Sequence, residues 1–205
     1  MSLARSLWEG NADLAAAALA HPFVRGLSDG SLPRESFAAY VAQDAYFLEA
    51  FARAYAFGVA YSPDRVALEA FADLLSGVRD ELRLHDSYAV RWGIDLSTVE
   101  PAATTLAYTE FLLVVASTGG LGVTCAAMAP CMRLYAHLGQ SLSGRAADPY
   151  AEWVSTYADP GFEALAVTLE GLLDTHAGDT AVVHEAYGRA MRLELAFFDT
   201  AFGRI

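Results

Sequence analysis

The sequence predicts an all-α fold, a single-domain bundle of many helices. Apolar residues recur at helical spacing along most of the chain, and the alternating pattern typical of strands is nearly absent. The 205 residues are enough for one domain with a substantial core, and no long linker, repeat or low-complexity segment divides them. Residues 1–205 are therefore expected to form one bundle.

Residues that begin or end helices place the elements along the chain. Pro33, Pro63, Pro101 and Pro160 each suit the first turn of a helix, where a missing N–H group does no harm. The glycine pair 119–120 separates two further helices. Periodicity alone indicates the others. The expected helices span residues 3–19, 22–29, 33–60, 63–91, 101–117, 120–139, 149–157, 160–175 and 179–202.

Pro130 lies inside the expected helix 120–139. A proline there removes a backbone hydrogen bond and clashes with the preceding turn, so we expect a kink just before Cys131. Such a kink frees backbone groups and opens space. The following segment 140–150, QSLSGRAADPY, is the most loop-like part of the chain.

Asp44 stands among aromatic residues on one helix face. Tyr40, Asp44, Phe47 and Phe51 follow the spacing i, i+4, i+7, i+11, so they share a stripe that should face the core. Burying an unpaired carboxylate costs several kcal/mol. Asp44 therefore needs a partner, a bound ligand or a proton.

The basic residues exclude several classes of protein. All 13 are Arg, since the chain contains no Lys. Schiff-base enzymes, pyridoxal phosphate enzymes and P-loop phosphate transferases need a lysine amine, so these classes are excluded. The net charge of −12 argues against direct binding to nucleic acid, whose phosphates are bound largely by cationic side chains.

Hydropathy favours a cytoplasmic protein without a membrane partner. The chain is 55% apolar and its mean hydropathy is positive, which argues against disorder. No uninterrupted apolar run reaches the roughly 18 residues that a membrane span needs. The first residues, MSLARSLWEG, lack the basic region and apolar block of a signal peptide.

Neither the two cysteines nor the pair of Glu81 and His85 has the pattern of a metal site. Cys125 and Cys131 lie too far round a helix to pair and lack the spacing of a zinc site, and Cys125 fits a small buried apolar residue. For Glu81 and His85, at i and i+4, an ion pair or a contact to a neighbouring helix is preferred over metal binding. The repeated Glu-x-x-His motif of carboxylate di-metal bundles is absent.

Seven motifs follow one another over nearly the whole chain. They are HPFVRGLSDGSLP near the start, YVAQDAYFL at 40–48, ELRLHDSYAVRWGI at 81–94, YTEFLL at 108–113, APCMRLYAHLG at 129–139, YAEWVSTYADPGF at 150–162 and ELAFFD at 194–199. In this order they resemble the TenA/thiaminase II family. The resemblance implies a heme oxygenase-like all-α fold, a homotetramer, and no metal or organic cofactor.

The same resemblance implies a reaction in thiamine salvage. Members of this family hydrolyse the bond between a pyrimidine's 5-methylene and its leaving group. Their substrate is 4-amino-5-aminomethyl-2-methylpyrimidine, here called the aminopyrimidine, which yields hydroxymethylpyrimidine and ammonia, while thiamine reacts more slowly. The ring must lose its aromaticity before the group can leave. A thiolate that adds to a ring carbon achieves this while an acid protonates a ring nitrogen.

Six residues of this chain match the family's functional positions. Cys131 follows a proline and matches the nucleophile, and Glu194 in ELAFFD matches the acid/base. Apolar neighbours of Glu194 favour a raised pKa, which suits an acid near neutrality. Asp44 matches the carboxylate that holds the pyrimidine's amino group and ring nitrogen. The residues that match the substrate-binding pocket are Phe47, Tyr108 and Tyr157.

Two positions depart from the family pattern, and two other functions stay open. Phe47 stands where the family usually has a tyrosine, so the aromatic ring has lost a hydroxyl, and Phe198 replaces a tryptophan. A pyrimidine-binding or thiamine-binding regulatory protein without turnover is the first alternative, although binding alone needs neither Cys131 nor Glu194. The second is another heme oxygenase-like enzyme, such as an oxidase related to pyrroloquinoline quinone synthesis or a di-iron member, which would need inward-pointing His and Glu ligands.

Overall fold

The computed structural model describes residues 1–203, and in that part of the chain it confirms the all-α prediction. None of the described helices is both long enough and apolar enough to cross a membrane. The elements in order are α1 (Leu3–Gly10), α2 (Ala12–Ala20), α3 (Pro22–Asp29), α4 (Arg34–Tyr61), α5 (Arg65–Trp92), the 3₁₀ helix η1 (Leu96–Thr98), α6 (Ala103–Thr118), α7 (Gly120–Leu142), α8 (Ala151–Tyr157), α9 (Pro160–His176) and α10 (Ala181–Phe202).

Two of the predicted helix boundaries are wrong. The predicted helix 3–19 breaks at Asn11, whose φ of −117° is not helical. The Asn11 side-chain amide donates to the Leu7 carbonyl oxygen at 2.8 Å, a local hydrogen bond that competes with continuation of the helix. The helix predicted to end at residue 139 continues to Leu142, so the loop-like segment 140–150 begins later than expected.

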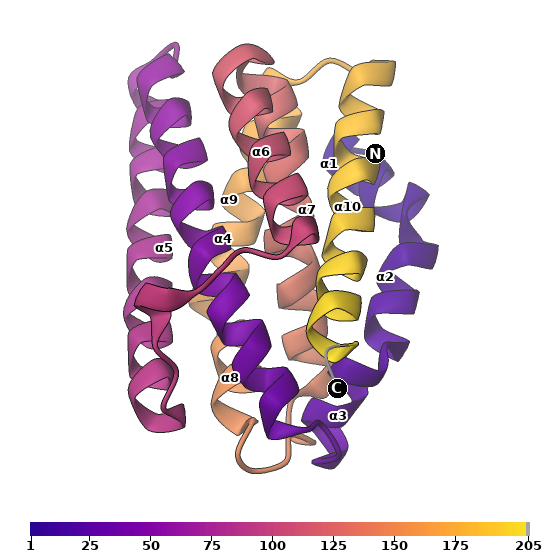
Figure 1. Ribbon diagram of the computed structural model, residues 1–205. Coiled ribbons are helices and arrows are strands. Elements are labelled where there is room, and N and C mark those ends of the chain that lie inside the picture. Colours follow the sequence, from indigo (N-terminus) through magenta and orange to yellow (C-terminus); the bar gives the residue numbers. More distant parts are fainter. Residues whose placement is uncertain (204–205) are drawn as a thin grey trace.

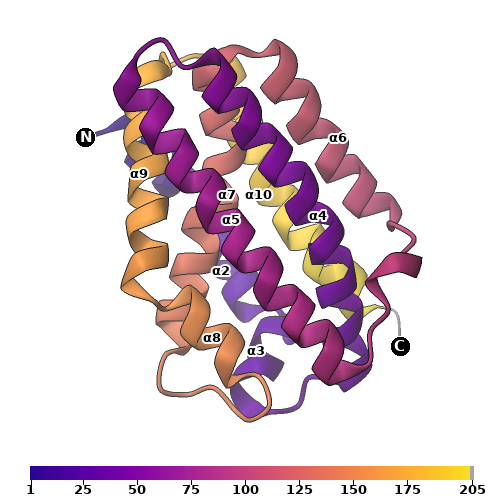
Figure 2. The ribbon, with the colours of Figure 1, turned by 90° about the vertical axis from the view of Figure 1, so that its left-hand side faces the viewer.

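Helix α7 occupies the centre of the bundle. It packs against α6, α8, α9 and α10, and it also contacts α4. Helices α4 and α5 run side by side along one flank, whereas α2 and α3 lie against α10 on the opposite flank (Figure 1). In the view turned by 90°, α5 and α4 lie in front of α7, with α9 and α6 on either side (Figure 2). A side chain on α7 can therefore meet groups from most of the bundle.

Two glycines let other backbones approach α7 closely. A Cβ atom at Gly122 would lie 2.4 Å from the carbonyl oxygen of His176, at the end of α9. A Cβ atom at Gly139 would lie 2.4 Å from the carbonyl carbon of Tyr157, at the end of α8. Pro130 lies inside α7 as the sequence indicates, and the helix continues on both sides of it. A kink at Pro130 stays a prediction.

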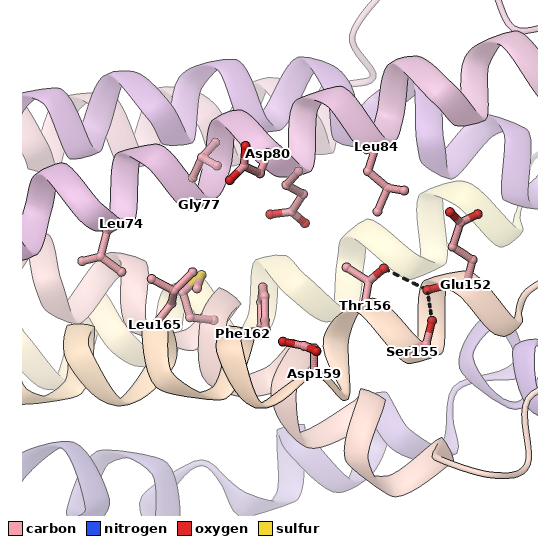
Figure 3. A pocket seen from close by; sticks show the side chains of 13 residues that line it. Leu74, Gly77, Asp80, Leu84, Glu152, Ser155, Thr156, Asp159, Phe162 and Leu165 are labelled. Atoms are coloured by element: carbon pink, nitrogen blue, oxygen red, sulfur yellow. Dashed lines mark hydrogen bonds between the residues drawn. The ribbon is translucent and has the colours of Figure 1, made fainter.

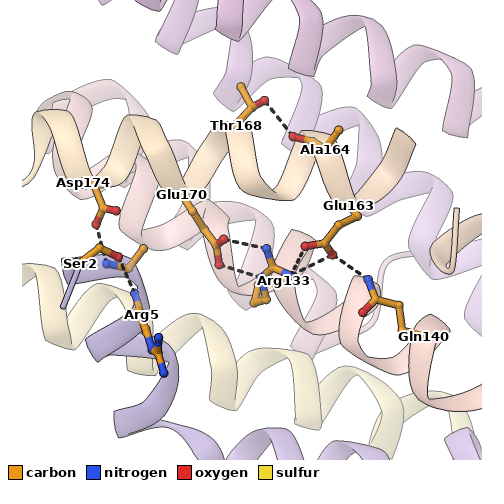
Figure 4. Close-up of polar contacts among 10 residues, drawn as sticks. Ser2, Arg5, Arg133, Gln140, Glu163, Ala164, Thr168, Glu170 and Asp174 are labelled. Atoms are coloured by element: carbon orange, nitrogen blue, oxygen red, sulfur yellow. Dashed lines mark hydrogen bonds and ion pairs between the residues drawn. The ribbon is translucent and has the colours of Figure 1, made fainter. Parts of the chain in front are cut away.

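A partly buried cluster of charged residues holds the middle of α7 against α9 (Figure 4). Arg133 donates to both carboxylate oxygens of Glu170 at 2.7 Å and to Glu163 at 2.8 and 2.9 Å. Gln140 donates to the same Glu163 carboxylate at 2.7 Å. Paired, bidentate contacts of this kind fix geometry as well as charge. They hold the helix turn that carries Cys131, two residues before Arg133.

Candidate active site

The six residues predicted from the sequence come from five helices of the bundle. Helix α4 carries Asp44 and Phe47, and α6, α7, α8 and α10 carry one residue each. Five of the six are at least 96% buried, whereas Cys131 is partly exposed. Their sequence separations reach 150 residues, from Asp44 to Glu194, so only the packing of the bundle brings them together.

Glu194 on α10 is a buried carboxyl group with two neighbours. The Tyr108 hydroxyl donates to Glu194 Oε1 at 2.5 Å across the interface of α6 and α10. The Cys131 thiol lies near the same carboxyl group, close enough for the charge of Glu194 to raise the pKa of the thiol. Burial raises the pKa of Glu194 to about 8, although the hydrogen bond from Tyr108 opposes the shift. Near neutral pH this carboxyl group can both give and take a proton.

Cys131 and Cys125 differ in their surroundings. Burial raises the pKa of Cys131 well above its ordinary value, and the nearby carboxylates of Glu194, Glu81 and Asp44 raise it further. Burial alone accounts for the raised pKa of Cys125, which is about 12. Cys125 is fully buried, in agreement with its expected role as a small apolar residue. Both thiols are protonated in the free protein, but only Cys131 has carboxyl groups nearby that can exchange its proton.

Asp44 forms an ion pair with His85 of α5. His85 Nε2 lies 2.7 Å from Asp44 Oδ2, and Nδ1 donates to the Glu81 carbonyl oxygen at 3.0 Å. Because both ring nitrogens face acceptors, the imidazole carries two protons. Burial lowers the pKa of His85, but the hydrogen bond to Asp44 and the charges of Asp44 and Glu81 outweigh it, so the pKa rises to about 9. Of the two alternatives to metal binding that the sequence favoured for Glu81 and His85, the structure shows for His85 the contact to a neighbouring helix.

The two oxygen atoms of Asp44 differ in their contacts. Oδ2 accepts from His85 and also from the Tyr40 hydroxyl at 3.1 Å. Among the residues that the structure describes, none forms a hydrogen bond with Oδ1. The Tyr40 hydroxyl in turn lies 3.2 Å from that of Tyr135 and accepts from Trp153 Nε1 at 3.3 Å. Asp44 is thus oriented through one oxygen, and its other oxygen is available to a ligand.

Aromatic rings surround these polar groups. The ring centroid of Phe47 lies 4.7 Å from that of Tyr108 and 6.0 Å from that of Phe197. The Tyr157 ring lies 4.8 Å from Tyr135, and its hydroxyl donates to Glu81 Oε1 at 2.5 Å. The faces of these aromatic rings can stack against a flat heteroaromatic ligand.

Five residues of this hydrogen-bond network were not predicted as site residues. They are Tyr40, Glu81, His85, Tyr135 and Trp153. A helical-spacing signal was available for two of them, since Tyr40 precedes Asp44 by four residues and Tyr135 follows Cys131 by four. For Glu81 and His85 the sequence showed only their mutual spacing. Their partners lie on α8 and α4, which periodicity cannot reveal.

A cavity of about 640 Å³ lies between α5 and the helices α8 and α9 (Figure 3). Leu84 and Leu74 of α5 face Phe162 and Leu165 of α9 across it. A reaction on one pyrimidine ring should bring the six predicted residues into a single enclosed pocket, but none of them lines this cavity. Two other residues connect this cavity to the polar network around Asp44 and Glu194. Glu81 and Met132 line the cavity, while Glu81 also accepts from Tyr157 and Met132 follows Cys131.

Solved structures place this architecture in a known class. A TenA family transcription regulator from Silicibacter sp. TM1040 matches with a TM-score of 0.90, 29% sequence identity, and coverage of 98% of this chain and 97% of that chain. The fold is therefore heme oxygenase-like, an all-α bundle, and it here surrounds the Cys131 thiol and two buried carboxyl groups, Asp44 and Glu194.

Sequence comparisons give the family. The model of the TENA/THI-4/PQQC family matches residues 9–203. An aminopyrimidine aminohydrolase from Halalkalibacterium halodurans is 38% identical over 98% of this chain and 96% of its own length. A protein of the same name from Bacillus subtilis is 32% identical over 78% of this chain and 68% of its own length. The chain belongs to the TENA/THI-4/PQQC family.

Proposed function

We propose that the protein is an aminopyrimidine aminohydrolase of thiamine salvage. It converts the aminopyrimidine and water into hydroxymethylpyrimidine and ammonia, and it acts more slowly on thiamine. Two relatives named aminopyrimidine aminohydrolase support this activity. The single observation that carries the proposal is the proximity of the Cys131 thiol to the Tyr108-bound carboxyl group of Glu194. A thiol beside a proton-exchanging carboxyl group is what addition to a pyrimidine requires.

The proposed first step moves one proton through Glu194. Protonated Glu194 gives its proton to a ring nitrogen and takes the proton of Cys131 as the sulfur adds to a ring carbon. The raised pKa of Glu194, about 8, supports this double role because both forms are populated near neutrality. The Tyr108 hydroxyl orients the carboxyl group by donating to Oε1. The ring thereby loses its aromaticity without a free thiolate accumulating.

The later steps release ammonia and restore the ring. The bond from the methylene carbon to nitrogen breaks, its electron pair goes to nitrogen, and ammonia departs. Because the amine leaves from its protonated form, the methylene group is then joined to the ring by a double bond, to which water adds through its oxygen while the departing ammonia takes up the proton that the water loses. The carbon–sulfur bond breaks, the ring nitrogen returns its proton through Glu194 to Cys131, and aromaticity is restored. One water is consumed for each ammonia released, and no metal or organic cofactor takes part.

Asp44 is the proposed anchor for the substrate's exocyclic amino group. Support comes from its Oδ1 atom, which no described residue engages, and from His85 and Tyr40, which orient the group through Oδ2. Phe47, Tyr108 and Tyr157 are the proposed aromatic walls. Stacking of bases on such rings contributes about 1–3 kcal/mol in proteins that bind single-stranded nucleic acid, which is enough to hold a single ring in register.

Residues 1–205 are proposed to act as one domain in a cytoplasmic homotetramer. The core supports one domain because it draws on every α-helix from α1 to α10. Exposed apolar side chains on α4 and α6 support assembly, among them Tyr61, Leu106 and Val114. Val114 also lines a shallow apolar groove with Phe57. Light scattering of the purified protein measures the mass of the assembly.

The proposed activity is tested with the natural protein alone. The protein is incubated with the aminopyrimidine and, separately, with thiamine, and hydroxymethylpyrimidine and ammonia are measured over time. The proposal predicts equal amounts of the two products from the aminopyrimidine, and faster reaction than with thiamine. Tight binding of the pyrimidine without turnover would instead support a regulatory protein.

A further inference from the structure

Glu81 joins the buried polar cluster to the cavity between α5, α8 and α9. Its Oε1 atom accepts from the Tyr157 hydroxyl at 2.5 Å, and its side chain also lines the cavity beside Val78 and Met132. Through Met132 this wall is one residue from Cys131. Glu81 thus stands at the boundary between the polar cluster that contains Tyr157 and this open space, into which a group leaving a pyrimidine bound in the cluster would pass.

The other acidic residues of the cavity have partners that Glu81 lacks. Asp80 binds Arg83 at 2.6 Å, Glu152 binds Arg91, and Asp159 accepts from the backbone N–H of Gly161 at the start of α9. Glu81 accepts only from a neutral hydroxyl, and no described cationic side chain forms an ion pair with it.

His85, the cation whose charge acts on Glu81, is already paired with another carboxylate. His85 donates to the Glu81 backbone carbonyl oxygen, but its ion pair is with Asp44. Burial raises the pKa of Glu81 to about 7, with the charge of Asp44 adding to the shift and that of His85 opposing it. An added cation near Glu81 would therefore be stabilised, because it would relieve an unpaired and partly desolvated carboxylate.

We propose that Glu81 and this cavity form the subsite for the leaving group, in which the Glu81 carboxylate binds a primary ammonium group. This inference rests on the proposed function. The amine of the aminopyrimidine is a cation with three N–H donors near neutral pH, whereas thiazolium in thiamine carries charge without N–H groups. Glu81 is thus a residue that selects a primary amine as leaving group, and the cavity receives the ammonia after the carbon–nitrogen bond breaks.

Binding of a matched pair of ligands tests this subsite without depending on turnover. The aminopyrimidine and hydroxymethylpyrimidine share the ring and differ only in an ammonium or a hydroxyl group. Their dissociation constants are measured by calorimetry, at a pH where Glu81 is largely ionised, on Cys131→Ser protein with and without Glu81→Gln. We expect Glu81→Gln to weaken binding of the aminopyrimidine about tenfold, equal to ~1.4 kcal/mol, and to leave that of hydroxymethylpyrimidine within about twofold.

Two further variants separate charge recognition from altered structure. Asp73→Asn removes the same charge from an exposed position on α5 and should change neither constant. Glu81→Asp keeps the charge but shortens its reach, and it should give an intermediate preference even if Glu81→Gln folds poorly. Equal weakening of both ligands, or no change in either, would overturn the subsite. If neither ligand binds the Cys131→Ser protein and the natural protein shows no hydrolysis, the proposed function fails as well.

Discussion

At the scale of a single residue, Asp44 shows which properties of a site can be predicted from the sequence and which cannot. Helical spacing with Tyr40 and Phe47 predicted that Asp44 is buried and needs a partner, and its side chain is 6% exposed. The partner, His85, lies 41 residues away on α5. Periodicity gives the face of each helix but not which helices meet. The need for a partner could therefore be predicted, whereas its identity could not.

Phe47 lies at the position where the chain departs from its family's pattern. Its ring contacts Tyr108, whose hydroxyl donates to Glu194. Phe47→Tyr adds a hydroxyl at the edge of this network, and one oriented hydrogen bond contributes about 0.5–1.5 kcal/mol. We expect kcat for the aminopyrimidine to rise up to about tenfold while binding changes little, since both rings stack alike. Steady-state kinetics on the two proteins measures this. An unchanged kcat would mean that Phe47 is a neutral replacement.

At the scale of elements, local signals located the helices well and failed where side chains compete with the backbone. Every helix from α3 onward begins within two residues of its predicted start. Asn11 was missed because its amide bonds the Leu7 carbonyl oxygen in place of a helical N–H. The sequence predicts a helix end at Gly139, yet this residue lies inside α7. The tertiary reason for that glycine is the close approach of α8, which the sequence does not display.

Gly139 gives a direct test of this close approach. In Gly139→Ala the new Cβ would meet the Tyr157 and Ala158 backbone at 2.4–2.5 Å, so α8 must shift. We expect a loss of about 1–3 kcal/mol in the free energy of unfolding. Gly171→Ala is the control, since its Cβ meets nothing within 4 Å and should stabilise α9 by about 0.5–1 kcal/mol. Urea denaturation measures both, and similar effects of the two variants would contradict the packing argument.

At the scale of the whole molecule, the sequence predicted a helical bundle but not how its helices are paired. Hydrophobic spacing requires α7 to be buried on several faces without specifying its neighbours. The order of motifs supplied what periodicity lacked, since resemblance over the full chain implies one known arrangement. The structure adds the ion pair of Asp44 with His85 and the cavity beside Glu81.

The buried titratable groups predict an unusual pH dependence of stability. The pKa of Glu81 rises from 4.5 to about 7 and that of Glu194 from 4.5 to about 8 on folding, and that of His85 rises from 6.5 to about 9. At a pH between a group's unfolded and folded pKa values, the group holds a proton in the folded state that it releases in the unfolded chain. Each group therefore lowers stability as pH rises through its window, by up to about 1.4 kcal/mol per pH unit.

Glu194→Gln isolates one of these contributions. The glutamine does not titrate, so its free energy of unfolding should fall less steeply between about pH 5.5 and about pH 8 than that of the natural protein. Urea denaturation at the two pH values gives both slopes. Parallel slopes would show that Glu194 has the same pKa in the folded and unfolded states.

The two cysteines provide the most direct test of a Cys131-centred site, because each can be replaced by serine in the same chain. Cys131→Ser replaces an ionisable thiol with a hydroxyl that forms almost no anion near neutrality. Hydrolysis of the aminopyrimidine should fall by at least about a hundredfold, equal to ~2.7 kcal/mol of barrier, while the ligand still binds. Cys125→Ser should keep its activity and lose only about 1–3 kcal/mol of stability, since it buries a hydroxyl. Equal losses of activity in the two variants would contradict the account.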